Sequence, residues 1–209
     1  MIRLLVADDH TLVRNGIRHT VQVTNDIIVA DEARNGQEVL DKVQSNDYDV
    51  ILLDISMPGR DGLEILKELR LQKRGPAVLI LSIYPEELYA VRALRSGAAG
   101  YLTKDSAPDE LIAAIRKVHA GGRYVTASLA EKLAASLSTP EAGKRHELLS
   151  DREYQIMGMM ASGKTQTQIA GELSLSIKTI GTYRTRILSK MNMNNNAEIT
   201  RYAIENKLI

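Results

Sequence analysis

The stretch VILLDISMPGRDGLEIL, residues 50–66, decides the fold. An apolar run leads into a single carboxylate, Asp54, and a turn-forming segment with Pro58, Gly59 and Gly62 separates that carboxylate from a helical pattern. A continuous apolar run is typical of a strand that is buried on both faces of a parallel sheet. The carboxylate at its end needs an explanation, because an ordinary buried strand leaves its charged residues to the turn.

The same alternation of apolar runs and helical patterns fills the first 120 residues. Short apolar runs predict five strands, and apolar spacing with a period of 3.6 residues predicts five helices between and after them. Strands that alternate with helices predict an α/β fold, here a doubly wound five-stranded parallel sheet. The predicted strands are 2–7, 27–33, 49–54, 77–82 and 100–103, and the predicted helices are 11–23, 35–45, 61–72, 85–96 and 108–120.

The sequence pattern changes after Gly121 and Gly122. Residues 127–138 predict a short helix, and the polar segment 139–147 predicts a linker. From Ser150 onward, two capping boxes, a serine cap and an asparagine-rich break predict four short helices, two of them with the proportions of a helix-turn-helix. We therefore expect a first domain at 1–121, a linker with a short helix at 122–147, and a second, all-α helix-turn-helix domain of four helices at 148–209.

Composition and charge exclude several classes of site. The chain has no cysteine, which excludes disulfides, thiolate zinc sites and cysteine nucleophiles, and its four histidines show no metal-ligand spacing. Residues 144–209 hold 10 Lys and Arg against 6 Asp and Glu, a net charge of +4, which leaves −3 for the rest. No signal peptide pattern and no membrane-length apolar run is present, so we expect a cytoplasmic protein without membrane contact.

Charged and hydroxyl side chains follow four of the five predicted strands. Asp8 and Asp9 end the first strand, Asp54 the third, Ser82 the fourth and Lys104 the fifth. Because ligands bind at the carboxyl ends of strands in such sheets, these groups are expected to share one site. Converging carboxylates repel one another unless a cation lies among them, and oxygen ligands favour Mg²⁺. Metal, hydroxyl and ammonium together suit a phosphoryl group, with Asp54 as the nucleophile.

These residues resemble a known family. DDH at 8–10, LLDISMPGRDG at 52–62, Ser82 and Lys104 resemble the receiver domain of bacterial two-component response regulators over about residues 1–121. The resemblance implies that Asp54 accepts a phosphoryl group from a sensor histidine kinase. It further implies that Mg²⁺ is held by Asp8, Asp9, Asp54 and the backbone carbonyl of Ser56. Lys104 is implied to pair with the phosphoryl oxygens. Ser82 and Tyr101 are implied to be switch residues that move toward the phosphate.

The helix predicted from Ser176 to about Met191 has two different sides. Its apolar side is expected to face a core through Ile177, Ile180, Ile187, Leu188 and Met191. Its other side carries small and hydroxyl residues flanked by basic ones, a composition that suits the major groove of DNA.

Residues 149–193 resemble the LuxR-type helix-turn-helix of NarL/FixJ-family regulators, through S-x-R-E, A-x-G and Q-I-A-x-x-L-x-x-S-x-K-T. Gly181 and Tyr183 depart from the lysine and histidine that many relatives carry. The residues implied to contact DNA are Lys178, Thr179, Gly181, Thr182, Tyr183, Arg184, Thr185, Arg186 and Lys190.

The two resemblances together imply a phosphorylation-switched transcription regulator. It is expected to bind double-stranded promoter DNA as a homodimer formed on phosphorylation through the helix at 197–206, and not to be an enzyme beyond slow self-dephosphorylation. Three alternatives compete with this interpretation. A haloacid-dehalogenase-like phosphatase would carry a second Asp at position 56, where the chain has Ser56. The others are a helical domain that binds protein, and a regulator with a decayed pocket, against which the full acidic set speaks.

Overall fold

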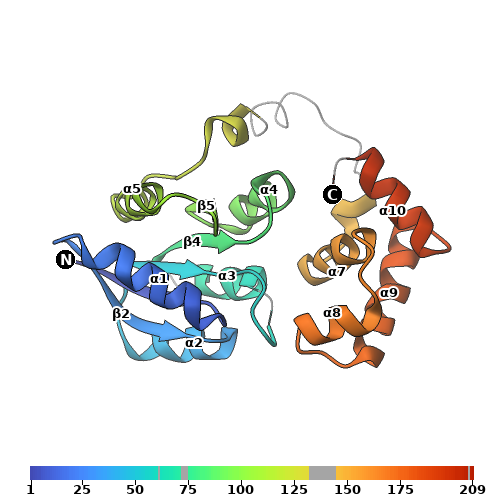
Figure 1. Ribbon diagram of the computed structural model, residues 1–209, viewed down its shortest axis with the longest axis horizontal. Helices are drawn as coiled ribbons and strands as arrows, with labels where there is room; N and C mark the ends of the chain where they lie inside the picture. The colour runs from blue at the N-terminus through green and yellow to red at the C-terminus, as the bar shows by residue number, and fades with distance from the viewer. Residues whose placement is uncertain (61, 72–74, 132–144, 207) are drawn as a thin grey trace. The chain divides into compact units, whose positions relative to one another are not determined.

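A computed structural model describes residues 1–60, 62–71, 75–131, 145–206 and 208–209 (Figure 1). The chain divides into two compact units, Met1–Leu133 and Ala134–Ile209. The first contains β1 (Ile2–Ala7), α1 (Thr11–Gln22), β2 (Ile27–Ala33), α2 (Gly36–Ser45), β3 (Val50–Leu53), α3 (Gly62–Arg70), β4 (Ala77–Ser82), α4 (Glu86–Ser96), β5 (Gly100–Thr103) and α5 (Pro108–His119). The second contains the 3₁₀ helix η1 (Arg145–Leu148), α7 (Asp151–Ala161), α8 (Gln166–Glu172), α9 (Ile177–Met191) and α10 (Asn196–Glu205).

The first unit is built on a five-stranded sheet with the order β2-β1-β3-β4-β5, in which every neighbouring pair is parallel. The strand order reverses direction after β1, so β1 and β3 lie side by side at the centre, and their carboxyl ends meet at one edge. The predicted doubly wound α/β fold is confirmed, with helix and strand boundaries within two residues of those expected from the sequence.

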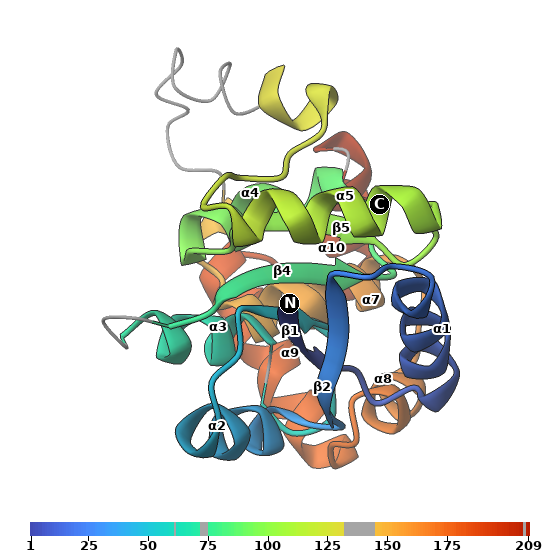
Figure 2. The same cartoon turned by 90° about the vertical axis from the view of Figure 1, so that its left-hand side faces the viewer.

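Helices cover both faces of this sheet. Helices α1 and α5 contact each other on one side, and α2, α3 and α4 pack in sequence on the other, as can be followed in Figure 2. The α1/α5 side contains a core of strand and helix residues. Strand β3 is buried along its whole length, which explains its unbroken apolar run, because neither face of the strand meets water.

The turn after β3 brings backbone segments very close together. Gly59 adopts a left-handed conformation with φ of 84°, which a residue without a Cβ atom adopts at little cost. Gly62 opens α3 directly against the strand end: a Cβ atom there would lie 2.4 Å from the carbonyl oxygen of Asp54. These glycines therefore let the chain reverse beside Asp54 without covering it.

The second unit is a bundle of short helices. Side-chain caps begin α7, α8 and α9 at Ser150, Thr165 and Ser176, and the first two are complete capping boxes, as the sequence predicts. Helix α7 packs against α9 and α10, and α8 packs against α9. The bundle core is formed by buried apolar residues of all four α-helices, including Ile156, Met157, Ile169, Ile180, Ile187, Met191, Ile199 and Ala203.

Two expectations need comment. Ile177 was expected to face this core, but 52% of its surface is exposed. Ile177 is the first residue of α9, about a sixth of a turn from the buried stripe centred on Ile180 and beyond the end of the bundle core. Of the helix predicted at 127–138, residues 127–131 are helical, and the rest lies outside the described residues. In the parts of the chain that are described, no helix is both long enough and apolar enough to cross a bilayer.

The close approach at Gly62 predicts a clear stability difference. Gly62→Ala should lower the free energy of unfolding by about 1–3 kcal/mol, because the added Cβ meets backbone atoms that cannot rotate away. As the control, Gly16→Ala lies in α1 with nothing within 4 Å of the added Cβ, and it should stabilise by about 0.5–1 kcal/mol. Urea unfolding followed by circular dichroism measures both, and a Gly62→Ala variant as stable as wild type contradicts this packing.

Candidate functional sites: an acidic pocket and an exposed helix

The sheet brings Asp8 and Asp54 together at the ends of β1 and β3. Ala7 pairs with Leu53 in the last register position, and the amide of Asp54 donates a hydrogen bond to the Ala7 carbonyl at 2.9 Å. Both aspartates are only 1% exposed. Two carboxylates held side by side and out of water repel each other, so the fold must supply positive charge at this point.

Lys104 supplies that charge. Its Nζ lies 2.7 Å from Asp54 Oδ2 and 2.6 Å from Asp8 Oδ2, and its side chain is only 11% exposed. The residue is positioned by its own backbone, since its amide donates to the carbonyl of Ser82 at 2.8 Å. One ammonium group therefore bridges the two carboxylates, and the sequence-predicted residues Asp8, Asp54 and Lys104 form one cluster.

Burial and the contacts between Lys104 and the carboxylates act in opposite directions on the pKa values of this cluster. Burial raises the pKa of Asp54, and the neighbouring Lys104 ammonium and the hydrogen bond from the Ser56 amide, at 3.0 Å to Oδ1, offset only part of that rise. For Lys104, burial acts to lower the pKa, but the charge of Asp54 and hydrogen bonds to both carboxylates outweigh it, and the pKa is raised. The pocket therefore favours the ammonium form of Lys104, while burial makes the Asp54 carboxyl group harder to ionise than it is in water.

The donor set of the pocket fits a hard divalent cation. Ligand atoms of Asp8, Asp9, His10 and Asp54 all lie within 4.8 Å of one another. Asp8 Oδ2 and Asp9 Oδ1 are both buried, and Asp8 Oδ2 lies 2.6 Å from Lys104 Nζ. Carboxylate oxygens gathered at one point are suited to bind a cation such as Mg²⁺, whose preferred ligands are oxygens. His10 Nδ1, 3.0 Å from Asp9 Oδ1, adds one nitrogen at the rim.

Arg14 supports Asp8 from behind, and the sequence analysis did not identify it. The guanidinium is almost fully buried, donating from one nitrogen to the Asp8 carbonyl at 2.8 Å and from Nε to Glu32 at 2.8 Å. A signal was present, since Arg14 occupies the same helical stripe as the buried Ile17 and Val21. A charged residue on an apolar stripe indicates a buried ion pair.

The two expected switch residues are both buried. The Ser82 hydroxyl accepts a hydrogen bond from the Tyr84 amide at 3.2 Å. Tyr101 is 1% exposed, and its hydroxyl donates to the carbonyl of Tyr84 at 2.8 Å. Burial raises the pKa of the Tyr101 phenol. In this structure the ring of Tyr101 therefore already points inward, under the loop that joins β4 to α4.

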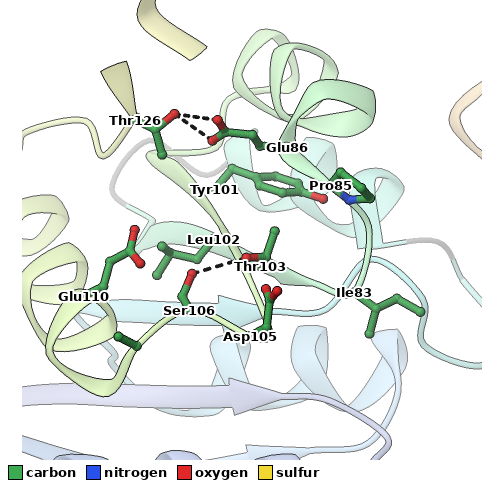
Figure 3. Close-up of a pocket in the computed structure, with 11 residues that line it drawn as sticks. Ile83, Pro85, Glu86, Tyr101, Leu102, Thr103, Asp105, Ser106, Glu110 and Thr126 are labelled. Atoms are coloured by element: carbon green, nitrogen blue, oxygen red, sulfur yellow. Dashed lines mark hydrogen bonds between the residues drawn. The ribbon is translucent and has the colours of Figure 1, made fainter. Parts of the chain in front are cut away.

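A pocket of about 430 Å³ lies beside Tyr101, and the segment after α5 forms one of its walls (Figure 3). The Thr126 hydroxyl lies 2.6 and 2.8 Å from the two carboxylate oxygens of Glu86, in the first turn of α4. The same hydroxyl accepts from the Leu129 amide at 3.2 Å, and so begins the helical residues 127–131. Thr126 therefore fastens this segment to α4.

Tyr124 fastens the same segment to β5 and α5. Its amide donates to the Ala99 carbonyl at 2.8 Å, and it forms a parallel bridge with Gly100. Its hydroxyl donates to Glu110 at 2.9 Å. Because a Cβ at Gly100 would lie 2.7 Å from the Tyr124 carbonyl oxygen, this contact requires glycine in β5. The sequence analysis missed this docking, because nothing in a short polar segment indicates its partner.

Helix α9 carries the residues predicted to contact DNA. Lys178, Thr182, Thr185, Arg186 and Lys190 are exposed, and Thr179, Gly181, Tyr183 and Arg184 are partly exposed. Some of the side chains have partners within the bundle. Arg184 donates to Asn196 at 2.7 Å, and Lys190 pairs with Glu153 at 2.6 Å.

Two family models match the chain. Residues 4–116 match the response regulator receiver domain, and residues 147–203 match the bacterial regulatory proteins of the luxR family. The chain is also 38% identical over 209 residues to response regulator UvrY of Escherichia coli strain K12, covering all of this chain and 96% of that relative. The chain is a two-component response regulator of the NarL/FixJ family.

Other similar proteins agree with this assignment. Response regulator GacA of Pseudomonas viridiflava is 36% identical over 210 residues, which covers all of this regulator and 98% of that relative. The crystal structure of response regulator ChrA in a heme-sensing two-component system is 33% identical, with a TM-score of 0.54, and covers all of this chain and 98% of that chain.

A further similar structure was solved on DNA. RcsB from Salmonella enterica serovar Typhimurium, bound to promoter rprA in the presence of phosphomimetic BeF₃⁻, is 25% identical with a TM-score of 0.65, and covers 97% of this regulator and 98% of that chain.

Family membership rejects two of the three alternatives to the interpretation as a transcription regulator. Regulators of this kind are transcription factors and not classical enzymes, which rejects the phosphatase interpretation. The luxR-family match identifies the helical domain as a DNA-binding one, which rejects a helical domain that only binds protein.

The docked segment of the regulator gives a testable prediction. Thr126→Val removes both contacts with Glu86 and the cap of residues 127–131, so amide exchange in peptides that span 122–131 should accelerate about tenfold, the equivalent of about 1.4 kcal/mol. Thr24→Val is the control, because it removes a hydroxyl bond to the Val21 carbonyl elsewhere in the same unit. Hydrogen exchange measured by mass spectrometry tests both variants. Unchanged exchange at 122–131 in Thr126→Val would show that Thr126 does not fasten this segment to α4.

Proposed function

We propose that Asp54 is the phosphoacceptor of this response regulator, and that its phosphorylation by a sensor histidine kinase controls promoter binding by the helical domain. The observation that carries the proposal is the Lys104 ammonium, 2.7 Å from Asp54 and 2.6 Å from Asp8. A buried carboxylate beside a fixed ammonium has the charge arrangement that phosphoryl transfer requires.

The transfer forms one bond and breaks one. An oxygen of the Asp54 carboxylate attacks the phosphorus of a phosphohistidine on the kinase, the phosphorus–nitrogen bond breaks, and the histidine leaves with its electron pair. The product is an aspartyl phosphate, which water hydrolyses slowly to restore the carboxylate. Before transfer, the Lys104 ammonium balances the charge of the Asp54 carboxylate. After transfer that charge lies on the phosphoryl oxygens, and Lys104 neutralises it there.

Asp8, Asp9, Asp54 and the backbone carbonyl of Ser56 would hold Mg²⁺ in this site. The bound ion supplies neutralisation of negative charge on the transferring phosphoryl group. Support comes from the gathering of oxygens at one point, since ligand atoms of Asp8, Asp9 and Asp54 lie within 4.8 Å of one another. The intact set of acidic residues is also the reason for preferring a phosphorylated regulator to one with a decayed pocket.

The signal would leave the pocket through the loop between β4 and α4. We assign Ser82 and Tyr101 as the residues that respond to the phosphoryl group, because Ser82 ends β4 and both contact the backbone of Tyr84. Two residues farther along, Glu86 holds Thr126 of the segment after α5. Movement of this loop toward a phosphoryl group therefore pulls on the segment that leads to the helical domain.

The output is binding to double-stranded promoter DNA by a homodimer formed on phosphorylation, with α10 as the contact between DNA-binding domains. The domain limits proposed for this scheme are 1–121 for the receiver, 122–147 for the connection and 148–209 for the DNA-binding domain. Helix α9 would enter the major groove and would use the nine residues predicted above to contact DNA. Such a regulator works in the cytoplasm, where its promoter and the kinase domain of its partner are located.

The proposed phosphoacceptor can be tested directly. With Mg²⁺ and acetyl phosphate, the wild-type chain should gain the mass of one phosphoryl group, and Asp54→Asn should gain none because an amide is a far weaker nucleophile. Asp41→Asn, on the exposed face of α2, is the matched control and should be modified like wild type. Intact-protein mass spectrometry reads the result, and phosphorylation of Asp54→Asn at the wild-type level would refute the assignment.

A further inference from the structure

The hydroxyl groups on the outward face of α9 are already bonded to their own helix. Thr182 Oγ1 donates to the carbonyl of Lys178 at 3.1 Å, and Thr185 Oγ1 donates to the carbonyl of Gly181 at 3.1 Å. Both residues are exposed. A threonine whose hydroxyl turns back to the preceding helical turn offers its γ-methyl group to whatever approaches from outside.

The neighbours of these two threonines on α9 differ in what they offer. Gly181, one turn before Thr185, offers only backbone, whereas Lys178, one turn before Thr182, offers a long donor. Gln166 Oε1 lies 3.7 Å from where a Cβ at Gly181 would be. The central part of the face, around Thr182 and Thr185, therefore combines methyl groups and bare backbone with the lysine side chain.

Basic residues lie around this central part. Lys178 and Arg186 are exposed on α9, and Arg184 is fixed by its bond to Asn196. Long cations at the edge of a groove-binding helix neutralise phosphates on the two walls of the groove, and such contacts carry no sequence information. Sequence information must then come mainly from the central face, where Thr182 and Thr185 are short side chains and Lys178 is a long donor.

We infer that this face, through Thr182 and Thr185, reads DNA by apolar contact with the C5-methyl groups of thymine. The inference rests on the proposed binding of α9 in the major groove. There thymine alone among the four bases presents a methyl group, and threonine methyls are suited to contact it. Guanine is normally read by long bidentate donors, and neither threonine hydroxyl has its proton free to donate to O6 or N7.

The size of the expected effect follows from methyl burial. Burying one methyl or methylene group is worth about 0.8 kcal/mol, which corresponds to about a fourfold change in Kd. A site that loses one contacted methyl should therefore bind about fourfold more weakly. Losing the methyls opposite both threonines should weaken binding by about tenfold or more, if the two contacts act independently.

The experiment begins with selection of preferred sequences from random double-stranded DNA by the full-length regulator, treated with acetyl phosphate and Mg²⁺. Each thymine in the preferred site is then replaced singly by deoxyuridine, which lacks only the C5-methyl group and pairs identically. We expect two or more positions in each half-site at which the replacement raises Kd about fourfold or more. If no single thymine-to-uracil replacement changes Kd, the inference fails.

A pair of substitutions assigns the contact to the methyl group. Thr185→Ser keeps the hydroxyl and its bond to the Gly181 carbonyl but removes the methyl, so it should lose the preference for thymine over uracil at one position. Thr185→Val keeps a methyl and removes the hydroxyl, so it should retain that preference. The opposite pattern, with Ser retaining and Val losing it, overturns the inference in favour of reading by the hydroxyl oxygen.

Thr24→Ser, after the end of α1, is the matched control, because its hydroxyl is likewise bonded to a nearby backbone carbonyl, that of Val21 at 2.7 Å. It should leave the thymine preference of the wild type in place. The experiment also separates two kinds of failure. Binding to bulk DNA without any preferred sequence overturns the methyl reading and leaves the proposed function standing, whereas no DNA binding in either phosphorylation state overturns both.

Discussion

Two carboxylates that must share a buried strand edge are the constraint on which the receiver depends. Asp8 and Asp54 are each 1% exposed and follow neighbouring parallel strands, so their charges cannot be dispersed into water. The fold meets this constraint with Lys104, the residue after β5, while Arg14 of α1 holds the backbone carbonyl of Asp8. A balance held by one bridging ammonium changes when a phosphoryl group or a cation enters, which is what makes the pocket suitable as a switch.

The same pocket is connected to the rest of the receiver through a short chain of contacts. Ser82 and Tyr101 both bond the backbone of Tyr84, and Glu86 at the start of α4 holds Thr126. The links are hydrogen bonds at both ends of the chain segment Tyr84–Glu86, which joins them covalently. The segment after α5 is thus part of the receiver's contact network and not only a spacer.

Much of this arrangement was predictable from the sequence, for identifiable reasons. The positions of strands β1, β3 and β4 are predictable because burial on both faces of a strand requires an unbroken apolar run. The capping boxes at Ser150 and Thr165 predict where two helices begin, because a capping box involves only residues close in sequence. The convergence of Asp8, Asp54 and Lys104 was predictable because each residue ends or follows a strand, and parallel strands end at the same edge of a sheet.

The misses were contacts that local sequence does not encode. Tyr124 and Thr126 bond residues 14 and 40 positions away, and neither has a local pattern that names its partner. Ile177 was assigned to the core from apolar character alone, although the first residue of a helix can extend past the bundle it joins. Local sequence also does not determine where the threonine hydroxyls on α9 point, because a threonine at a given helical position is compatible with several rotamers.

The measurement that tests the central claim most directly is the affinity for promoter DNA as a function of Asp54 phosphorylation. Fluorescence anisotropy on a selected site, with sizing of the same samples, would compare the wild type and Asp54→Asn with and without acetyl phosphate and Mg²⁺. The account predicts that phosphodonor raises both DNA affinity and dimer content in the wild type and changes neither in the variant. Equal DNA affinity in all four samples would contradict it, and would leave a DNA-binding protein whose control does not pass through Asp54.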